Sequence, residues 1–569
     1  MRPCAIAGTR PALFILAALA AFTFDETARA QEPESDPTQK PEPQPEAGED
    51  AAPSDVAPEA ADEAGTPDEA PAREAGTPEE APAPEPSPSP QPKPAAATPP
   101  PAPQGSEGPP PSTAVAAVET EAAPESTAEQ SWYYRPPLRV AFGKGDRQVG
   151  LTFYGFLQAD LIYDTTRSYS ESMDDDLVAR TDTYDGTVGR TQFSTRNTRL
   201  GLMFESPELG GVRPVAVVEG DFFGNQPGDP PDVSERDYYE SATFRLRKAY
   251  VELQNRFVDV LVGQDYDVFG WQNRFFPCSG EFLGLPNQVF SRSTQLRLSR
   301  AFGASGPVGL EVAASAARPA QRDSATPDVS AGLLLAANKY RGISTSGNGF
   351  TRDQPLSLGV SGTVRQFKVD AFAPPPTQTS NEVTGWGMSI DAFVPVIAAK
   401  DANDRGNALT LTGSFVMGTG IGDLMNATGG ATFPTLPNPA LANPPPVYEG
   451  NIDAGIVSFD LMGVLHTIDW QGFKVGLEVH LPPSGRIFFA ANYTQAYSEN
   501  LRELFPQGGA EIELLTHVAD KSQYVDANLF YDATPAVRFG VAGAYTTVEY
   551  LDGDQPENIR ARFQAMYFF

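Results

Sequence analysis

Arginines and carboxylates recur in several short segments that are otherwise apolar. Arg245 and Arg247 lie two residues apart, so in an extended strand their guanidinium groups share one face, roughly 7 Å apart. Glu219 and Asp221 have the same spacing in an earlier segment. An arginine stays charged and binds a carboxylate through a planar fork. In a narrow passage such a cluster favours anions. Alternatively, each arginine only neutralises a carboxylate and stiffens the wall, and the sequence leaves both interpretations open.

The alternation of polar and apolar residues assigns these charges to one polar face. On this parity, the candidate pore-lining residues are Arg199, Glu219, Asp221, Arg245, Arg247, Arg297 and Arg365. The assignment is ambiguous between Thr243 and Gln254, because Lys248 and Tyr250 fall on the same face. A β-bulge in this segment would exchange some of the assignments.

Catalytic and metal-binding chemistry have little support in the sequence. His466 and His480 could lie on adjacent strands with Asp460 nearby, but a common polar face explains them equally well. The acidic run 174–176 lacks the spacing of a calcium-binding loop. Cys278 has no partner for an intramolecular disulfide once the first residues are removed. We therefore expect no catalytic residue, no metal site and no cofactor.

The elements that carry these residues are short segments with a period of two. In Phe473 to Leu481 every odd position is apolar, and Val525 to Tyr531 and Val457 to Met462 show the same pattern. Such alternation predicts β-strands with one polar face and one apolar face. Beyond residue 30 we find no run of about 18 apolar residues, so no transmembrane helix is expected.

Three features favour a membrane barrel over a soluble sandwich. The polar face carries charges and amides, as a wet lumen requires. Aromatic residues occur near the ends of the expected strands, where an interfacial girdle places them: Tyr163, Tyr250, Tyr493, Tyr531, Tyr545 and Tyr567. The chain ends on Phe569, and this aromatic ending resembles the signal that the barrel assembly machinery recognises. The expected fold is all-β, a transmembrane antiparallel β-barrel with 16 strands preferred to 18 on length.

Three regions follow from the composition. Residues 1–30 form an expected signal peptide, with Arg2 and Arg10 before an apolar stretch and a small-residue cleavage site at 28–30. Residues 31–130 contain 25 prolines and no aromatic residue, which predicts a disordered periplasmic linker. Residues 131–569 form the expected outer-membrane barrel. The linker carries 22 acidic and 3 basic residues, −19 of the formal net charge of −32, and residues 131–569 carry −14. This remaining acidity of the expected barrel argues against nucleic-acid binding.

Two segments interrupt the alternation. Gly270 to Gln288 is rich in Phe, Gly and Pro, and we interpret it as a loop that folds into the barrel and constricts it. Asp423 to Gly450 contains six prolines and is either a second such loop or an ordinary extracellular loop.

Several motifs, in a specific order, resemble the DcaP-like outer-membrane porin family. They include 154–160 (YGFLQAD), 219–224 (EGDFFG), 245–250 (RLRKAY) and 385–387 (GWG), and they span most of residues 150–425. The resemblance implies a 16-stranded homotrimeric porin that admits small anionic solutes past the arginines named above. The Pro/Glu-rich tail departs from the short helical segment that family members often carry.

The function expected is passive diffusion of small hydrophilic, anionic solutes across the outer membrane, without enzymatic chemistry. The expected partners are these solutes, outer-membrane lipid and lipopolysaccharide, the barrel assembly machinery and two further copies of the chain, with cell-wall contact through the tail. The alternatives are a phosphate- or sugar-selective porin, an outer-membrane enzyme and a cell-wall anchor.

Overall fold

The structure is a computed structural model, and it describes most of the chain from Leu138 onwards. The described residues are 138–143, 147–173, 177–224, 242–281, 284–319, 324, 326–345, 351–373, 377–400, 404–426, 447–448, 455–459, 464–504 and 518–569. The expected signal peptide, the expected disordered linker 31–130, the acidic run 174–176 and Asp460 lie outside these residues.

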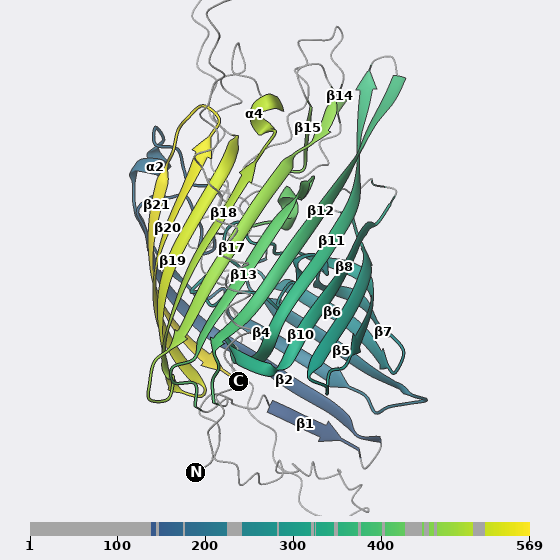
Figure 1. Ribbon diagram of the computed structural model, residues 1–569. Helices are drawn as coiled ribbons and strands as arrows, with labels where there is room; N and C mark the ends of the chain where they lie inside the picture. The colour runs from purple at the N-terminus through teal and green to yellow at the C-terminus, as the bar shows by residue number, and fades with distance from the viewer. Residues whose placement is uncertain are drawn as a thin grey trace, which may run out of the picture. The chain divides into compact units, whose positions relative to one another are not determined.

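Sixteen strand positions close into an antiparallel barrel within the described residues (Figure 1). They are β2 (Val149–Asp164), β3 (Arg190–Ser194) together with β4 (Arg199–Glu205), β5 (Val212–Asp221), β6 (Arg245–Asn255), β7 (Asp259–Tyr266), β8 (Arg292–Phe302), β9 (Val308–Ala317), β10 (Asp328–Thr345), β11 (Thr351–Ala373), β12 (Thr377–Ile397), β13 (Leu409–Thr419), β17 (Asp469–His480), β18 (Ile487–Ser498), β19 (Ala519–Thr534), β20 (Val537–Tyr550) and β21 (Glu557–Phe568). β3 and β4 count as one position, because both pair with the same side of β2. The predicted fold class and strand number are confirmed.

The barrel closes between its first and last wall strands. β21 pairs with β2 from Phe568 opposite Phe156 to Arg560 opposite Asp164. The terminal Phe569 exchanges two backbone hydrogen bonds of 3.1 Å with Gly155, and its ring stacks on Phe153. At Gly155, φ is +155° and a Cβ would lie 2.1 Å from the Arg199 carbonyl oxygen, so this close approach requires glycine.

Shorter elements lie outside the wall. They are β1 (Leu138–Phe142), α2 (Tyr184–Thr187), η3 (Phe269–Trp271), η4 (Gly422–Leu424), β14 (Val447–Tyr448), β15 (Val457–Phe459), β16 (Leu465–Thr467) and α4 (Leu501–Leu504). β15 and β16 form a separate two-stranded sheet, so the prediction of a wall strand at Val457 to Met462 is wrong. The alternation there reflects a buried loop, since Val457 is only 1% exposed. No helix in the described part of the chain is long and apolar enough to cross a membrane.

The two ends of the barrel differ in their connections. Short turns such as 256–258, 303–307 and 535–536 lie at one end, which we call the short-turn end; the chain's C-terminus lies there (Figure 1). Long connections such as 165–189, 267–291 and 420–468 lie at the other, the long-loop end.

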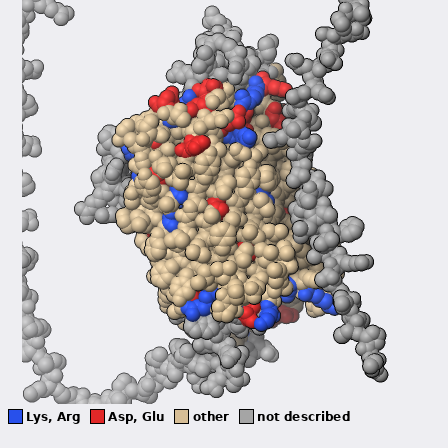
Figure 2. All heavy atoms as spheres, turned by 60° about the vertical axis from the view of Figure 1, so that its left-hand side comes forward, with Lys and Arg blue, Asp and Glu red and all other residues tan. Residues whose placement is uncertain are grey.

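The outer face of the wall is apolar, as the alternation predicts. In β19 and β21 the odd-numbered residues after Ala519 are exposed or half-buried, and most even-numbered residues are buried. Figure 2 shows part of this surface, where charged side chains gather towards the two rims and the band between them is mostly uncharged. Tyr163, Tyr531 and Tyr567 face outwards. Tyr250 was wrongly assigned to the outer girdle, because it pairs with the buried Val217 on the inner face.

The barrel interior is packed with loops at the long-loop end. A buried apolar cluster joins segments that follow β2, β7, β13 and β18, with Tyr169, Phe269, Leu424 and Leu501 among its members and Trp470 from the wall. Apolar packing of this kind is absent from the sequence-based picture of a wholly polar lumen.

Candidate functional site

A β-bulge in β6 brings three cations to the inner face. The register between β5 and β6 shifts after Glu219 pairs with Lys248, so that Gly220 faces Leu246 and Arg247 is the extra residue. A bulge leaves two residues of one strand opposite one residue of its partner. The bulge therefore directs three side chains, those of Arg245, Arg247 and Lys248, into the barrel. This resolves the ambiguous assignment of faces between Thr243 and Gln254.

Arg247 is the centre of a buried ion-pair group. Its Nη1 lies 2.7 Å from Asp221 Oδ2 and its Nε lies 3.2 Å from Glu219 Oε1. Arg245 Nη2 also reaches Asp221, at 2.9 Å. Arg247 and Asp221 are both fully buried. A buried charge needs partners of this kind, because its desolvation costs several kcal/mol.

Two guanidinium groups in this region have N–H groups without hydrogen-bond partners. Arg199 lies above the Phe156 ring and is 3.9 Å from Glu219, too far for a hydrogen bond, and its Nε and Nη2 lack hydrogen-bond partners. Arg292 stacks on Tyr266 and Phe290, and its Nη1 also lacks a partner. These N–H groups are buried, so they contribute positive charge to the interior without meeting a solute directly.

Arg297 completes what we call the basic wall. Arg297 and Lys248 share the Asp265 carboxylate, at 2.8 Å and 3.3 Å. The basic wall is defined as six cations, Arg199, Arg245, Arg247, Lys248, Arg292 and Arg297, with four carboxylates, Glu219, Asp221, Asp265 and Asp267. Within this set the cations outnumber the carboxylates by two, and Glu252, on the same inner face of β6, offsets one of them.

The structure separates the seven candidate pore-lining residues into two groups. The side chains of Arg245 and Arg297 are 27% and 21% exposed and face accessible space. Arg199, Glu219, Asp221, Arg247 and Arg365 are nearly or fully buried. Arg365 lies away from the basic wall, because it is on β11 and pairs with Asp328 and Asp423 at 2.9 and 2.5 Å.

The segment expected to fold inwards does so. Trp271 donates through Nε1 to the carbonyl oxygens of Leu333 and Val360, at 3.1 Å each. Farther along, the carbonyl oxygen of Phe275 accepts from Lys474 Nζ, and that of Cys278 accepts from Asn492 Nδ2. We call residues 267–291 the inward loop. It crosses from β10 and β11 to β17 and β18 within the barrel.

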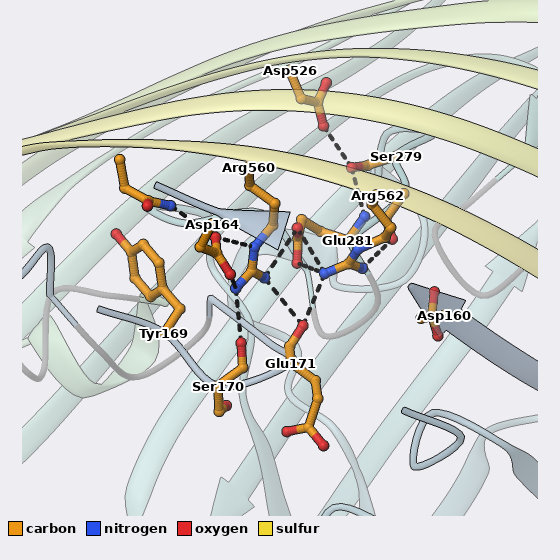
Figure 3. Close-up of polar contacts among 12 residues, drawn as sticks. Asp160, Asp164, Tyr169, Ser170, Glu171, Ser279, Glu281, Asp526, Arg560 and Arg562 are labelled. Carbon is orange, nitrogen blue, oxygen red and sulfur yellow. Dashed lines mark hydrogen bonds and ion pairs between the residues drawn. The ribbon is translucent and has the colours of Figure 1, made fainter. Parts of the chain in front are cut away.

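The far end of the inward loop is held by β21. Figure 3 shows Arg560 and Arg562 directed at Glu281, with Glu281 Oε1 3.6 Å from Arg560 Nη1 and 3.0 Å from Arg562 Nη2. Both arginines also donate to the carbonyl oxygen of Glu171, in the connection after β2. Glu281 is not among the residues that the sequence indicates as functional. It is the only acidic residue between Gly270 and Gln288, and this was the available signal.

The connection 420–468 also begins by folding inwards. Met425 forms a β-bridge with Val289, and the Phe290 amide donates to the Leu424 carbonyl oxygen at 2.9 Å. Asp423 pairs with Arg365. Of the two interpretations of Asp423 to Gly450, an inward fold holds for its first residues, and 427–446 lie outside the described residues.

The residues considered for catalysis do not assemble. His466 is in β16, which pairs with β15, whereas His480 ends β17 at the short-turn end. His480 Nε2 instead lies 2.7 Å from Glu478. Cys278 is buried against Phe488, Ala490 and Phe530. Among the residues that the structure describes, no group of three or more His, Cys, Asp or Glu side chains is placed to hold a metal ion.

Comparison with known proteins relates the fold to outer-membrane channels. No protein-family model matches the chain, and no curated protein matches it. Among solved structures, the outer-membrane channel DcaP of Acinetobacter baumannii is similar over 75% of this chain and 99% of its own, with 17% identity and a TM-score of 0.50. An anion-selective porin from Comamonas acidovorans covers 74% of this chain and all of its own, with 11% identity and a TM-score of 0.41, too low to carry an argument. The likeness to DcaP confirms, at the level of the fold, the resemblance that the motifs indicated.

Proposed function

We propose that this chain is an outer-membrane channel for passive diffusion of small hydrophilic, anionic solutes. The observation that carries the proposal is the basic wall, where six cations lie with four carboxylates and Arg245 and Arg297 remain partly exposed. In a confined, poorly hydrated passage, oriented donors and a positive field lower the energy of an anion and raise that of a cation. The channel-like fold supports the same function.

The two partly exposed arginines are the residues that meet the solute. Arg245 is held by Asp221 and lies beside the Phe223 ring, and Arg297 is held by Asp265. Each guanidinium is therefore fixed in position while part of it faces accessible space. The buried members of the basic wall act through their field and by holding these two side chains.

A flux assay with solutes of equal length tests the proposal. The refolded full chain in lipid vesicles should admit glutarate faster than 1,5-diaminopentane, with protein-free vesicles as the background. Arg245→Ala with Arg297→Ala should reduce this preference. Arg256→Ala, a change of an exposed arginine in the turn after β6, is the matched control and should leave it unchanged. Equal entry of both solutes, or faster entry of the diamine, contradicts the proposal.

The cellular arrangement belongs to the same proposal. Residues 1–30 are removed on export, 31–130 extend into the periplasm, and 131–569 form the barrel in outer-membrane lipid, assembled by the barrel assembly machinery as a homotrimer. N-terminal sequencing of the exported protein should begin near Gln31. Cross-linking in native membranes should give a species of three copies.

A further inference from the structure

The hairpin formed by β10 and β11 bends into the barrel at the short-turn end. The Thr345 amide donates to Glu478 Oε2 of β17 at 3.0 Å, and Thr351 Oγ1 accepts from Arg405 and from Arg538 of β20. A Cβ on Gly342 would lie 2.5 Å from Pro395, so the bent strand can pass this close to β12 only with glycine there.

A break in strand pairing makes the bend possible. Ala337 pairs with Leu356, but the next pair is Arg341 with Pro355, so three residues of β10 have no partner in β11. One of them, Asn338, donates through Nδ2 to the carbonyl oxygens of Gly303, Ala304 and Gly306 and so holds the turn after β8. Bulges bend and twist a strand, and proline is tolerated beside them.

A cavity of about 300 Å³ lies at this bend. Its lining includes Leu334, Ala336 and Pro355, which form an apolar surface, and three arginines, Arg274, Arg341 and Arg352. Its volume is at the lower end of the range for small-molecule sites. The cavity lies beside the inward loop, whose Arg274 carbonyl oxygen accepts from Gln354 Nε2 at 2.9 Å.

The three arginines differ in their partners. Arg274 pairs with Glu311 at 3.0 Å, and Arg341 pairs with Asp353 at 2.7 Å. Arg352 donates to the carbonyl oxygen of Asn273 at 3.2 Å and to its Oδ1 at 3.4 Å, and both acceptors are neutral. The cavity therefore combines an apolar surface with one guanidinium, that of Arg352, which forms no ion pair with a carboxylate of the described residues.

We propose that this cavity binds a short aliphatic monocarboxylate. The carboxylate pairs with the Arg352 guanidinium, and the hydrocarbon chain lies against Leu334, Ala336 and Pro355. Charge-assisted contact to a guanidinium supplies orientation. Burial of each methylene strengthens binding about three- to fourfold. The site names a solute class for the proposed channel, so its role in transport rests on the proposed function. Binding of a monocarboxylate at the cavity does not itself require conduction.

Binding to the refolded full chain in detergent micelles tests the site directly. With hexanoate as the probe, calorimetry should give tighter binding than with butyrate or with the neutral hexanamide. Arg352→Gln should weaken hexanoate binding about tenfold, because a charge-assisted pair is lost. Arg256→Gln, at the same end of the barrel but outside the cavity lining, is the matched control and should bind as the parent does.

A second variant keeps the test decisive if Arg352→Gln fails to fold. Ala336→Leu adds three carbons to the cavity surface and should weaken hexanoate binding without changing any charge. Hexanoate binding that both variants leave unchanged, or no binding to the folded parent chain, overturns the site. Anion-selective conduction without hexanoate binding would defeat only the site, whereas hexanoate binding without conduction would defeat only the proposed function.

Discussion

The outer and inner faces of the wall obey the same alternation but meet different surroundings. On the outer face of β19, Val525, Leu529 and Tyr531 are exposed side by side, as the sequence indicates. On the inner face, Asp526 and Asn528 are buried, because Ser279 and Gly280 of the inward loop hydrogen-bond to them. A period of two thus identifies the side of the wall that a residue faces. It does not reveal whether water or protein lies beyond.

The largest effect should come from breaking the buried ion pairs of the inner face. Arg247→Met should lower the free energy of unfolding by about 3–5 kcal/mol, because Asp221 and Glu219 lose a buried partner. Denaturant unfolding in lipid vesicles measures this. Arg300→Met is the control, since Arg300 donates only to the Asn255 carbonyl oxygen among its described contacts. An equal loss of unfolding free energy in both variants would mean that the inner face contacts water, as the sequence suggests.

The free-energy cost of placing a charge on the outer face should depend on the depth of the residue in the bilayer. Ala527→Arg should lower the free energy of unfolding by about 2–4 kcal/mol, because Ala527 is exposed on the outer face at the middle of β19, where the proposed bilayer contains only hydrocarbon. Gln523→Arg is the matched change nearer the long-loop end of the same face, where the expected cost falls to about 0–1 kcal/mol. If the two variants unfold alike in vesicles, this face does not contact lipid.

The inward loop should respond to the loss of its acidic anchor. Glu281→Gln removes the carboxylate that Arg560 and Arg562 share, so the loop should lie less firmly against β21 and single-channel conductance should rise. The loop's other hydrogen bonds remain, so the rise should be less than twofold. Glu503→Gln, in α4 at the long-loop end, is the control. An unchanged conductance would show that the loop's other anchors suffice.

The smallest effect concerns an exposed pair between two long-loop-end connections. Arg180 donates to Asp552 Oδ2 at 2.6 Å, and this hydrogen bond lowers the pKa of the Asp552 carboxyl. A lowered folded-state pKa stabilises the fold above the unfolded value near 4, and the contribution is lost as the pH falls through the folded value. Asp552→Asn should therefore cost less than about 1 kcal/mol at pH 7, and the cost should shrink as the pH is lowered to 2. Unfolding curves at both pH values check this.

The sequence predicts the wall well because each strand's pattern is local. Strand type, outward residues, strand number and the inward loop follow from alternation, length and one non-alternating segment. The spacing also places Arg245 and Arg247 on one inner face, and in the structure both pair with Asp221 because a bulge turns Arg247 inwards.

The remaining features depend on contacts between distant segments. Nothing local distinguishes Val457, buried in a loop sheet, from a wall strand. The burial of Arg365 depends on Asp423, in a connection that folds in from another part of the chain. The bend at 338–340 likewise could not be predicted from the sequence, because the alternation of polar and apolar residues does not indicate where pairing with β11 is lost.

Reversal potential in a planar bilayer under a salt gradient tests the central claim most directly. The refolded chain should conduct in discrete steps and prefer the anion. Arg245→Ala with Arg297→Ala should move the reversal potential towards that of a non-selective pore. Cation preference in the parent chain, or a folded barrel that does not conduct, would contradict the account of the basic wall as an anion-selective passage.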